Sequence, residues 1–332
     1  MANSIVATAD LDRKDLGILR LLDADARRPY SEMAKKLRMS KDAVQYRVER
    51  MKEQGVIRGF YAVIDPSVLG YMNYRFFLKL RGATPEIERK IIDYFVKDPR
   101  YWWVDSADGF RDLGVGCWLA SAGEFAEEKA KVLGRFGQHI AKLEEAVFTA
   151  FYLYPRVYLE PKITSKIVPL VLCQGQKADV DELDWKILGL IANDARASSI
   201  KIAGKAGVTP ATVLNRMKAM ERKGVIRQYR AMIDLEKLGY YWYKVEFTLR
   251  DYSVKGKMLE FFRHHPNIVY AYEAIGGADL EVEMEVESYA KFREVLDAIR
   301  AKFGDKIDTF QHLLWYKEHK ITYLPHRAAE HL

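Results

Sequence analysis

The chain contains one long stretch of sequence twice. Residues 11–71 recur without a gap as residues 180–240, an offset of 169 positions (180 − 11), and 23 of the 61 aligned residues are identical. A repeat of this length is a duplicated domain rather than a solenoid unit of about 20–50 residues. We therefore expect both halves to share one fold, so the role of a residue can be compared with that of its counterpart.

The first copy begins with the pattern of three short helices. Apolar residues recur at helical spacing over residues 12–22, 30–37 and 41–54. Ser40 stands before the third stretch as a good N-terminal cap, and Gly55 follows it as a typical C-terminal stop. Short helices joined by tight turns predict a helix-turn-helix.

The second copy repeats this plan. Thr209 takes the place of the cap, Pro210 stands at the first helical position, and Gly224 is the stop. The chain is therefore expected to carry two helix-turn-helix units.

Beyond each stop the hydrophobic pattern changes to a period of two, which is typical of a half-buried strand. The alternation covers residues 74–81 in the first half and 243–249 in the second. Each strand is followed by a helix, two strands, a second helix and a last strand, which is the βαββαβ order of a ferredoxin-like domain. The predicted segments are helices 85–97 and 124–136 with strands 101–107 and 113–120 in the first half, and helices 254–264 and 289–303 with strands 268–275 and 280–286 in the second.

These patterns predict an α+β protein with two winged helix-turn-helix domains and two ferredoxin-like βαββαβ domains in tandem. The predicted boundaries are 1–64 and 65–155 for the first pair, 156–178 for a linker, and 179–233 and 234–325 for the second pair. The linker assignment rests on the absence of 156–178 from the repeat and on its prolines and glycine. Its apolar centre, 167–173, could still pack against a domain.

Both copies carry residues of one regulator family. They are Asp12, Asp15, Ile18, Leu19, Ser40, Val44, Arg47, Gly55, Val56 and Ile57, then Asp181, Asp184, Ile187, Leu188, Thr209, Val213, Arg216, Gly224, Val225 and Ile226, with a Gly-x-x-Asp-Leu turn at 109–113 and again at 276–280. With a βαββαβ domain behind each set, the chain resembles the Lrp/AsnC (feast/famine) transcriptional regulators over nearly its whole length, twice. Family members are usually one such unit that dimerises, whereas here one chain supplies both halves.

The resemblance implies a sequence-specific DNA-binding regulator with double-stranded DNA as its partner. It also implies that the βαββαβ domains are RAM domains, which bind an amino acid or related small molecule near the Gly-x-x-Asp turn and mediate oligomerisation. The effector residues would be Gly109, Asp112, Gly276 and Asp279. We expect a homo-oligomer or an intramolecular pseudo-dimer, and no cofactor.

The third helix of each unit is predicted to approach DNA. Side chains near its start would reach base edges, and basic residues around it would pair with phosphates. The predicted DNA-binding residues are Lys41, Gln45, Tyr46, Arg47, Arg50, Thr212, Asn215, Arg216, Lys218, Arg222 and Lys223. One alternative is a solvated helix face. For Arg47 and Arg216, which share one register, another is pairing with a carboxylate inside their own domain.

The two copies differ in charge and in their base-facing residues. The window Ser40–Tyr61 holds five basic and three acidic residues (5 − 3 = +2), and Thr209–Arg230 holds six basic and one acidic (6 − 1 = +5). We therefore expect the second copy to bind phosphate more tightly. Because Gln45 and Tyr46 correspond to Leu214 and Asn215, the copies are expected to recognise different half-sites.

The effector residues have a structural alternative. A glycine at the turn lets the backbone approach a ligand or closes a tight hairpin. An aspartate there accepts from a ligand or from its own backbone. Both interpretations stay open at this point.

One strand of the second half alternates glutamates with apolar residues, so the carboxylates share one sheet face. They are Glu281, Glu283, Glu285 and Glu287. The default expectation is a face in contact with solvent. The alternative is that this face, opposite the helices, meets a partner whose basic residues pair well with it. The basic residues considered are Arg75, Lys79 and Arg81.

The sequence carries no P-loop, GxGxxG, HExxH or GxSxG, and its seven histidines show no metal-site spacing. We therefore predict that the chain is not an enzyme and binds no metal. A rival hypothesis is an enzyme that resembles the fused sirohaem decarboxylases of this architecture, although residues 101–117 and 268–284 lack their His/Arg/Tyr-rich pattern. A third is an effector-sensing protein with weakened DNA binding, to which Asp42 and Glu49 would contribute.

Composition is ordinary for a globular protein of 332 residues, with 49% hydrophobic and 30% charged residues. The net charge of +7 is mildly suggestive of a polyanionic partner. Cys117 and Cys173 form no CxxC pair or disulfide framework, which fits a reducing compartment. No apolar stretch is long enough to span a bilayer. We expect a soluble, cytoplasmic protein without a membrane partner.

Overall fold

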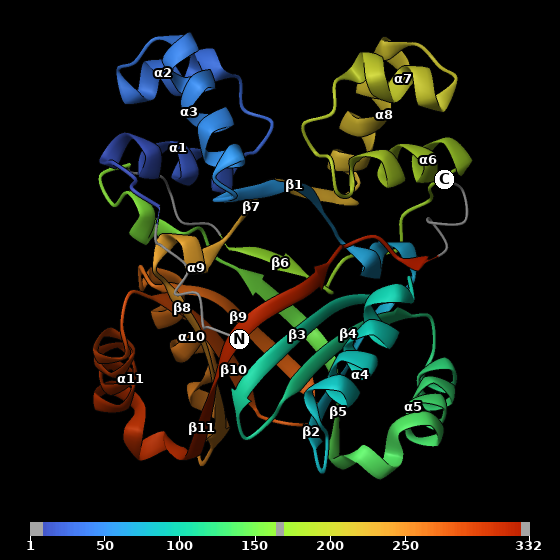
Figure 1. Ribbon diagram of the computed structural model, residues 1–332, viewed down its shortest axis with the longest axis vertical. Helices are drawn as coiled ribbons and strands as arrows, with labels where there is room; N and C mark the ends of the chain where they lie inside the picture. Colours follow the sequence, from blue (N-terminus) through green and yellow to red (C-terminus); the bar gives the residue numbers. More distant parts are fainter. Residues whose placement is uncertain (1–8, 164–168, 327–332) are drawn as a thin grey trace.

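Each repeated stretch folds into three helices followed by a strand, as predicted. The protein is described here by a computed structural model that covers residues 9–163 and 169–326. The first winged unit holds α1 (Arg13–Ala24), α2 (Tyr30–Leu37), α3 (Lys41–Glu53) and β1 (Ile57–Ile64), and the second holds α6 (Glu182–Ile191), α7 (Ser199–Ala206), α8 (Pro210–Arg222) and β7 (Ile226–Ile233). The two helical heads stand on the same end of the molecule (Figure 1).

The predicted caps and stops are confirmed. The side chain of Ser40 accepts a hydrogen bond from the backbone of Ala43 at 3.1 Å, and Thr209 accepts from Thr212 at 3.1 Å. Gly55 and Gly224 adopt φ values of 72° and 73°. Residues with a side chain rarely adopt this backbone conformation, so a glycine ends the third helix of each unit.

The strands after the two heads pair with each other. β1 and β7 form a two-stranded antiparallel sheet in which Tyr61 lies directly opposite Arg230. These residues are 169 positions apart, so an approximate two-fold axis passes between them. The two winged units therefore share one sheet within a single chain.

Each half then forms the predicted βαββαβ domain. In the first half it consists of β2 (Met72–Leu80), α4 (Pro85–Lys97), β3 (Tyr101–Gly109), β4 (Leu113–Leu119), α5 (Ala122–Phe136) and β5 (Ile140–Leu153). In the second it consists of β8 (Tyr241–Leu249), α10 (Lys255–His264), β9 (Ile268–Ile275), β10 (Leu280–Val286), α11 (Tyr289–Phe303) and β11 (Ile307–Ile321).

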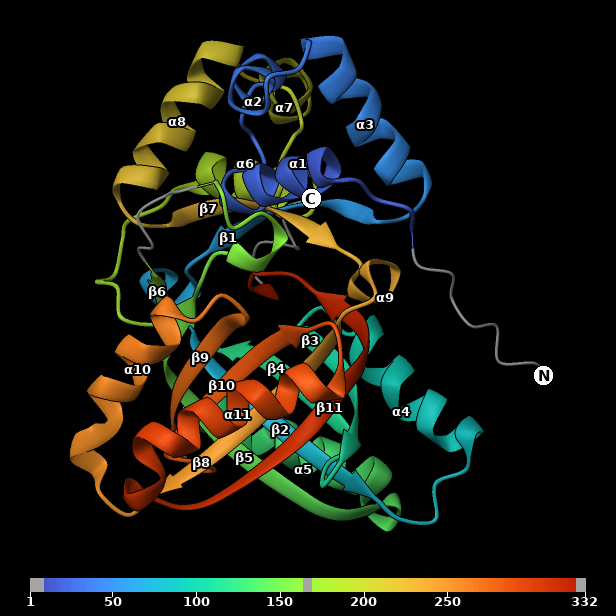
Figure 2. The same ribbon diagram turned by 90° about the vertical axis from the view of Figure 1, so that its left-hand side faces the viewer.

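The two βαββαβ domains close into one barrel. The strand order is β2-β4-β3-β11-β8-β10-β9-β5-β6, and a further pairing of β2 with β5 closes the ring. The last strand of each domain crosses to the other, since β11 pairs with β3 and β5 pairs with β9. Helices α4, α5, α10 and α11 lie on the outside (Figures 1 and 2). The halves therefore pair within the chain as a pseudo-dimer.

The barrel interior contains many tryptophans. Trp102, Trp103, Trp118 and Trp315 are buried there and join the core that extends down from the winged units. Gly114 and Gly116 make room for them, because a Cβ at Gly114 would lie 2.4 Å from Trp103 and one at Gly116 2.5 Å from Trp102.

The segment predicted as a linker is more ordered than a connection requires. It contains a 3-10 turn at Val157–Leu159 and a short strand β6 (Leu170–Leu172) that pairs with β5. Leu159 and Leu172 are buried. Part of the predicted apolar centre, residues 167 and 168, lies outside the described residues, and the part that follows packs against the barrel.

Within residues 9–163 and 169–326, none of the helices combines the length and apolar character that a bilayer crossing requires.

Candidate functional site

The third helices, α3 and α8, present their outer faces to solvent. Each buries one stripe against its own unit, made by Val44, Val48 and Met51 in α3 and by Val213, Met217 and Met220 in α8. The predicted base-facing residues lie on the opposite side. Gln45 and Asn215 are exposed, and Tyr46 and Leu214 expose 68% and 43% of their surface although both carry large apolar groups. Such faces are available to a ligand.

Arg47 and Arg216 are engaged inside their own units. Arg47 Nη1 lies 2.8 Å from Asp12 Oδ2 and 2.9 Å from Asp15 Oδ1. These hydrogen bonds raise the pKa of Arg47. Arg216 Nη1 lies 2.6 Å from Asp181 Oδ2 and 3.5 Å from Asp184 Oδ1. Each arginine therefore ties the third helix of its unit, called the recognition helix from here on, to the first helix. This is the alternative in which Arg47 and Arg216 pair with a carboxylate inside their own domain.

The same aspartates cap the first helices. Asp12 and Asp15 form a capping box at the start of α1, and Asp181 and Asp184 form one at the start of α6. The backbone N–H of Asp184 and the guanidinium of Arg216 lower the pKa of Asp181, and partial burial opposes them. One cluster thus stabilises a helix start and orients the recognition helix.

Most other basic residues around α3 also have partners. Arg50 pairs with Asp15, Lys52 with Glu49 and Arg58 with Glu318. Lys41 has no ion pair with any described residue. On α8, Lys218 and Arg222 have none within the described part of the chain, and Lys223 donates to the carbonyl of Asp179 at 2.5 Å.

The predicted charge window of the second copy includes one residue that cannot meet DNA. Arg230 is 1% exposed and pairs with Asp23 in the interior. The exposed excess of positive charge on the second unit therefore comes mainly from Lys218, Arg222 and Lys223, because the carbonyl that Lys223 contacts carries no net charge.

The predicted effector residues form two hairpin ends. Asp112 accepts from the backbone N–H of Leu80 at 2.6 Å and pairs with Lys79 at 2.7 Å. Asp279 accepts from the backbone N–H of Leu249 at 2.8 Å. Both aspartates thus bond to the backbone at the end of a neighbouring strand, β2 or β8, and not to the backbone of their own turn.

The turn glycines lie against neighbouring backbone. Gly276 has φ 83°, and a Cβ there would lie 2.6 Å from the carbonyl oxygen of Glu145 in the other half. Gly109 has φ 141°, and a Cβ there would lie 3.0 Å from Leu313. Each turn therefore packs closely against the opposite half of the barrel.

The glutamate face of β10 is not in contact with solvent, so the default expectation for it was wrong. Glu281, Glu283 and Glu285 are at most 1% exposed and point into the barrel, while Glu287 is exposed. The groups that bond to this face come from the second half itself and from the segment that follows β5. The reason is barrel closure, which turns the sheet face opposite the helices into an interior.

Glu281 and Glu283 find their partners within the second half. Lys244 Nζ lies 2.6 Å from Glu281. Glu283 accepts from Trp242 at 3.0 Å, from Tyr272 at 3.1 Å and from Trp315 at 3.2 Å. Burial raises the pKa of Glu283.

Of the basic counterparts considered, Arg75 is the one that enters the barrel. Its guanidinium lies 4.0 Å from the ring centre of Phe148 and 4.6 Å from that of Trp103. Arg111, which was not among the predicted residues, crosses between the halves by pairing with Glu144 at 2.7 Å and with Glu246. Its place in the Gly-x-x-Asp turn was the available signal.

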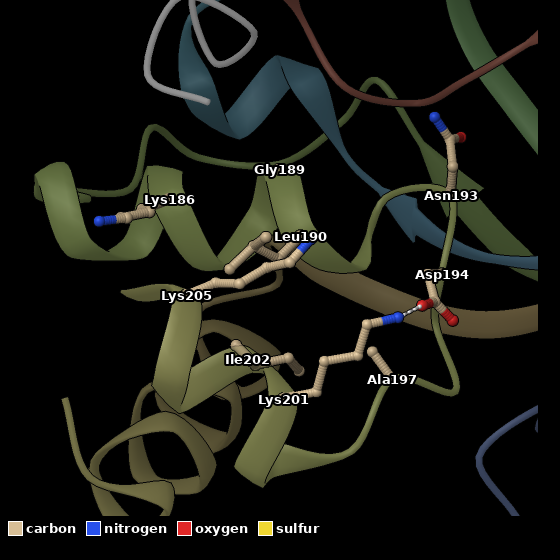
Figure 3. A pocket seen from close by; sticks show the side chains of 9 residues that line it. All are labelled: Lys186, Gly189, Leu190, Asn193, Asp194, Ala197, Lys201, Ile202 and Lys205. Carbon is tan, nitrogen blue, oxygen red and sulfur yellow. Dashed lines mark hydrogen bonds and ion pairs between the residues drawn. The ribbon is translucent and has the colours of Figure 1, made fainter. Parts of the chain in front are cut away.

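A cavity of about 590 Å³ lies between α6 and α7 of the second unit (Figure 3). Its wall includes Lys186, Lys201 and Lys205, and Lys201 pairs with Asp194 at 2.9 Å. The matched face of the first unit is covered, since a Cβ at Gly17 would lie 3.8 Å from Ile163. None of the predicted site residues lines this cavity.

Within the described ranges, no group of three His, Cys, Asp or Glu side chains is placed to hold a metal ion.

Comparisons with known proteins concern the winged units most directly. A family model described as an AsnC-type helix-turn-helix domain matches residues 11–52, and one described as a winged helix-turn-helix DNA-binding domain matches residues 180–227. The chain is similar to the HTH-type transcriptional regulator FL11 of Pyrococcus horikoshii, with 26% identity over 146 residues, or 44% of this chain and 95% of that protein.

A second relative is matched over a shorter stretch. The HTH-type transcriptional regulator Ptr1 of Methanocaldococcus jannaschii is 46% identical over 61 residues, which is 18% of this chain and 41% of that protein. The alignment therefore spans less than half of that regulator.

The tandem architecture also occurs in a solved structure. The chain is similar to the crystal structure of the siroheme decarboxylase NirDL. The match covers 93% of this chain and 93% of that one, with a TM-score of 0.61 and 12% sequence identity. At this identity the likeness is one of fold alone.

Proposed function

Because the chain is a tandem homologue of the Lrp/AsnC-family regulators with two helix-turn-helix domains, we propose that it is a sequence-specific DNA-binding transcriptional regulator. Both recognition helices would address one DNA site from a single chain. In this proposal the protein acts by binding and is not an enzyme.

One observation carries the proposal. α3 and α8 bury the same stripe and expose the opposite face, although that face includes the large side chains of Tyr46 and Leu214. The exposed positions include Gln45 and Asn215, whose amides are suited to adenine in the major groove. A recognition helix needs this kind of surface, whereas a purely structural helix does not.

The roles of the basic residues follow from their partners. Lys41, Lys218, Arg222 and Lys223 are exposed, and their charges are not neutralised by described acidic residues, so we assign them to phosphate. Arg47 and Arg216 orient the helices through their aspartates. Thr212 is already hydrogen-bonded to Thr209 at 2.9 Å near the start of α8.

The test is to sequence chromosomal DNA that co-purifies with the full-length chain. We expect enriched sites, and we expect their loss with the combined substitutions Gln45→Ala, Tyr46→Ala and Asn215→Ala. These residues are exposed, so the fold should persist and can be checked by circular dichroism. Substitution of the exposed Glu294 by Ala on α11, far from the heads, is the matched control.

The same preparation tests the decarboxylase-like alternative. Its absorbance spectrum should show no bound tetrapyrrole if the chain is a regulator. A tetrapyrrole band with no enriched DNA would overturn the proposal in favour of the enzyme. A wild type that shows neither enriched DNA nor a tetrapyrrole band would favour the effector-sensing alternative.

We also propose that an amino acid or related small molecule modulates DNA binding through the RAM domains. The support is the family resemblance and the presence of a Gly-x-x-Asp turn in each half. Substitution of a turn glycine is a poor test, because a Cβ at Gly276 would meet the backbone of Glu145. Asp112→Asn and Asp279→Asn are better, since an amide oxygen can still accept from the backbone while the charge is lost.

A thermal-shift screen of amino acids against the full chain tests this effector. A ligand that prefers the folded state should raise the melting temperature by mass action. We expect one or more amino acids to do so for the wild type and to lose the effect in the Asn variants. A screen without a stabilising amino acid would contradict the effector proposal and leave the DNA proposal intact.

A further inference from the structure

A buried ionic network joins the first winged unit to the second. Asp23, near the end of α1, is 0% exposed. Its carboxylate accepts from Arg230 of β7, with Nε at 3.0 Å, and from Arg156, with Nη1 at 2.8 Å and the backbone nitrogen at 2.9 Å. One carboxylate thus binds the second unit and the segment that leaves the barrel.

The network continues into the barrel. Arg156 donates from Nε and Nη2 to the two carboxylate oxygens of Glu285 on β10, both at 2.8 Å. Tyr158 also donates to Glu285. Bidentate arginine–carboxylate pairs fix orientation as well as distance. The two winged units and the second barrel half are therefore held by one chain of charged contacts.

The position related to this network by the approximate two-fold axis holds aromatic residues in place of the ion pair. At the offset of 169 positions, Ala192 replaces Asp23 and Tyr61 replaces Arg230. Tyr61 stacks on Tyr323 with ring centres 5.7 Å apart and an interplanar angle of 4°. Tyr323 also packs against Trp102, with ring centres 5.4 Å apart.

The two kinds of junction respond differently to displacement. Moving the units on the ionic side would separate buried charges that have no water to replace their partners, which is costly. Parallel rings on the aromatic side can slide and still bury their surface. The ionic side therefore adds to the shared β1–β7 sheet a restraint on how far one winged unit can move relative to the other.

We propose that Asp23 is a positioning residue that fixes the placement of α3 relative to α8 and so limits the spacing of DNA half-sites that the chain accepts. This inference rests on the proposed function. Asp23 itself is buried and meets no DNA. It acts through Arg230 and Arg156.

The chain supplies a substitution that should preserve folding. The double variant Asp23→Ala with Arg230→Tyr places on the ionic side the pair that already exists at Ala192 and Tyr61. Glu128→Gln is the matched control, because it weakens the ion pair of a buried carboxylate with Arg100 that lies within the first βαββαβ domain. Both variants are made in the full-length chain.

The first measurement is affinity for duplexes in which the two half-sites preferred by the wild type are moved apart or together by one to three base pairs. Each step displaces and rotates one half-site about the helix axis. We expect the wild type and Glu128→Gln to lose about tenfold or more in affinity at a shift of two base pairs. The double variant should lose about threefold or less. The same spacing profile in all three proteins would overturn the proposal.

The second measurement needs no DNA. Spin labels are attached to cysteines placed at the exposed positions Tyr46 and Leu214, in a chain in which Cys173→Ser removes the partly exposed native cysteine. Pulsed electron paramagnetic resonance then measures the distance between α3 and α8. We expect a narrow distribution for the wild type and the control, and a broader one for the double variant. Unchanged distances would overturn the coupling. Wild-type protein that binds no duplex at all would instead overturn the proposed function.

Discussion

The two recognition helices share their buried side and differ on their exposed side. Val44 and Val213 occupy the same buried place, as do Met51 and Met220, whereas Tyr46 stands where the second unit has Asn215. Packing restrains a buried side chain from all directions, and an exposed one is restrained only by what it binds. The comparison indicates that the two copies kept one scaffold and acquired different surfaces.

The aspartate–arginine clusters that hold the two recognition helices are also shared between the copies. The aspartates of the capping boxes and the arginine that pairs with them are identical in both copies. The first unit has one additional contact, from Arg50 to Asp15, where the second has Ala219. The first recognition helix is therefore held by two arginines and the second by one.

This difference predicts the largest effect. Asp15 is 1% exposed and pairs with two arginines that are 24% and 30% exposed, whereas Asp184 meets Arg216 only at 3.5 Å. We expect Asp15→Ala to cost about 2–3 kcal/mol, below the value for fully buried pairs because the arginines are partly hydrated. Asp184→Ala should cost about 1 kcal/mol.

Amide hydrogen exchange separates the two units in the intact chain, because it reports local opening. Protection should fall in α1 and α3 for Asp15→Ala, and less in α6 and α8 for Asp184→Ala. Both variants lose the same capping contact, so the difference reports the pair with Arg50 together with the closer contact of Arg47. Equal losses would show that the second pair with Arg50 contributes nothing.

The two junctions below the heads predict a dependence on pH. Burial opposes ionisation of Asp23, but Arg230 and Arg156 outweigh it and lower its pKa from 3.8 to about 2. Its stabilising contribution is therefore fully present above about pH 4 and is lost as the pH falls toward 2. A shift of this size corresponds to about 2 kcal/mol.

Urea unfolding at pH 7 and at pH 2.5 measures this contribution. The free-energy difference between the wild type and the Asp23→Ala, Arg230→Tyr variant should change by about 1.5 kcal/mol between the two pH values, in the direction that favours the variant in acid, because Asp23 is only partly protonated at pH 2.5. A difference that does not depend on pH would exclude Asp23 as the titrating group.

Unpaired positive charge predicts a smaller difference in the salt dependence of DNA binding. Each neutralised phosphate contributes about 0.9 to the slope of log K against log salt concentration. Lys218→Ala with Arg222→Ala should lower the slope by up to about 1.8, and Lys41→Ala by about 0.9 or less. Lys52→Ala is the control, since Lys52 is paired with Glu49 at 2.8 Å. Equal changes for the second unit and the first would remove the predicted asymmetry of charge.

The helices and strands were predictable because their signals are local. Caps at Ser40 and Thr209, stops at Gly55 and Gly224, and the change of period after them depend on neighbours in sequence. The structural role of Arg47 and Arg216 also had a signal. These arginines and their aspartates are identical in two copies whose base-facing positions differ, as expected of a scaffold.

Barrel closure was not predictable from local patterns. The alternation of Glu281, Glu283 and Glu285 is the same for a solvated strand face and for an interior lined with partners. Only the pairing of β11 with β3 and of β5 with β9 decides between them. Asp23 and Arg230 are likewise 207 positions apart, so their pairing exists only in the folded chain.

The most direct test of the account is selection of binding sites from random duplexes with the full-length chain. Because Gln45 and Tyr46 correspond to Leu214 and Asn215, we predict an asymmetric enriched motif, with wrong base pairs costing about 1–3 kcal/mol where a base is contacted directly. Substituting Gln45 and Tyr46 by Ala should relax one half of that motif and leave the other half unchanged. A strict palindrome would contradict the account, because it would mean that identical units from two chains pair on DNA or that one copy alone binds.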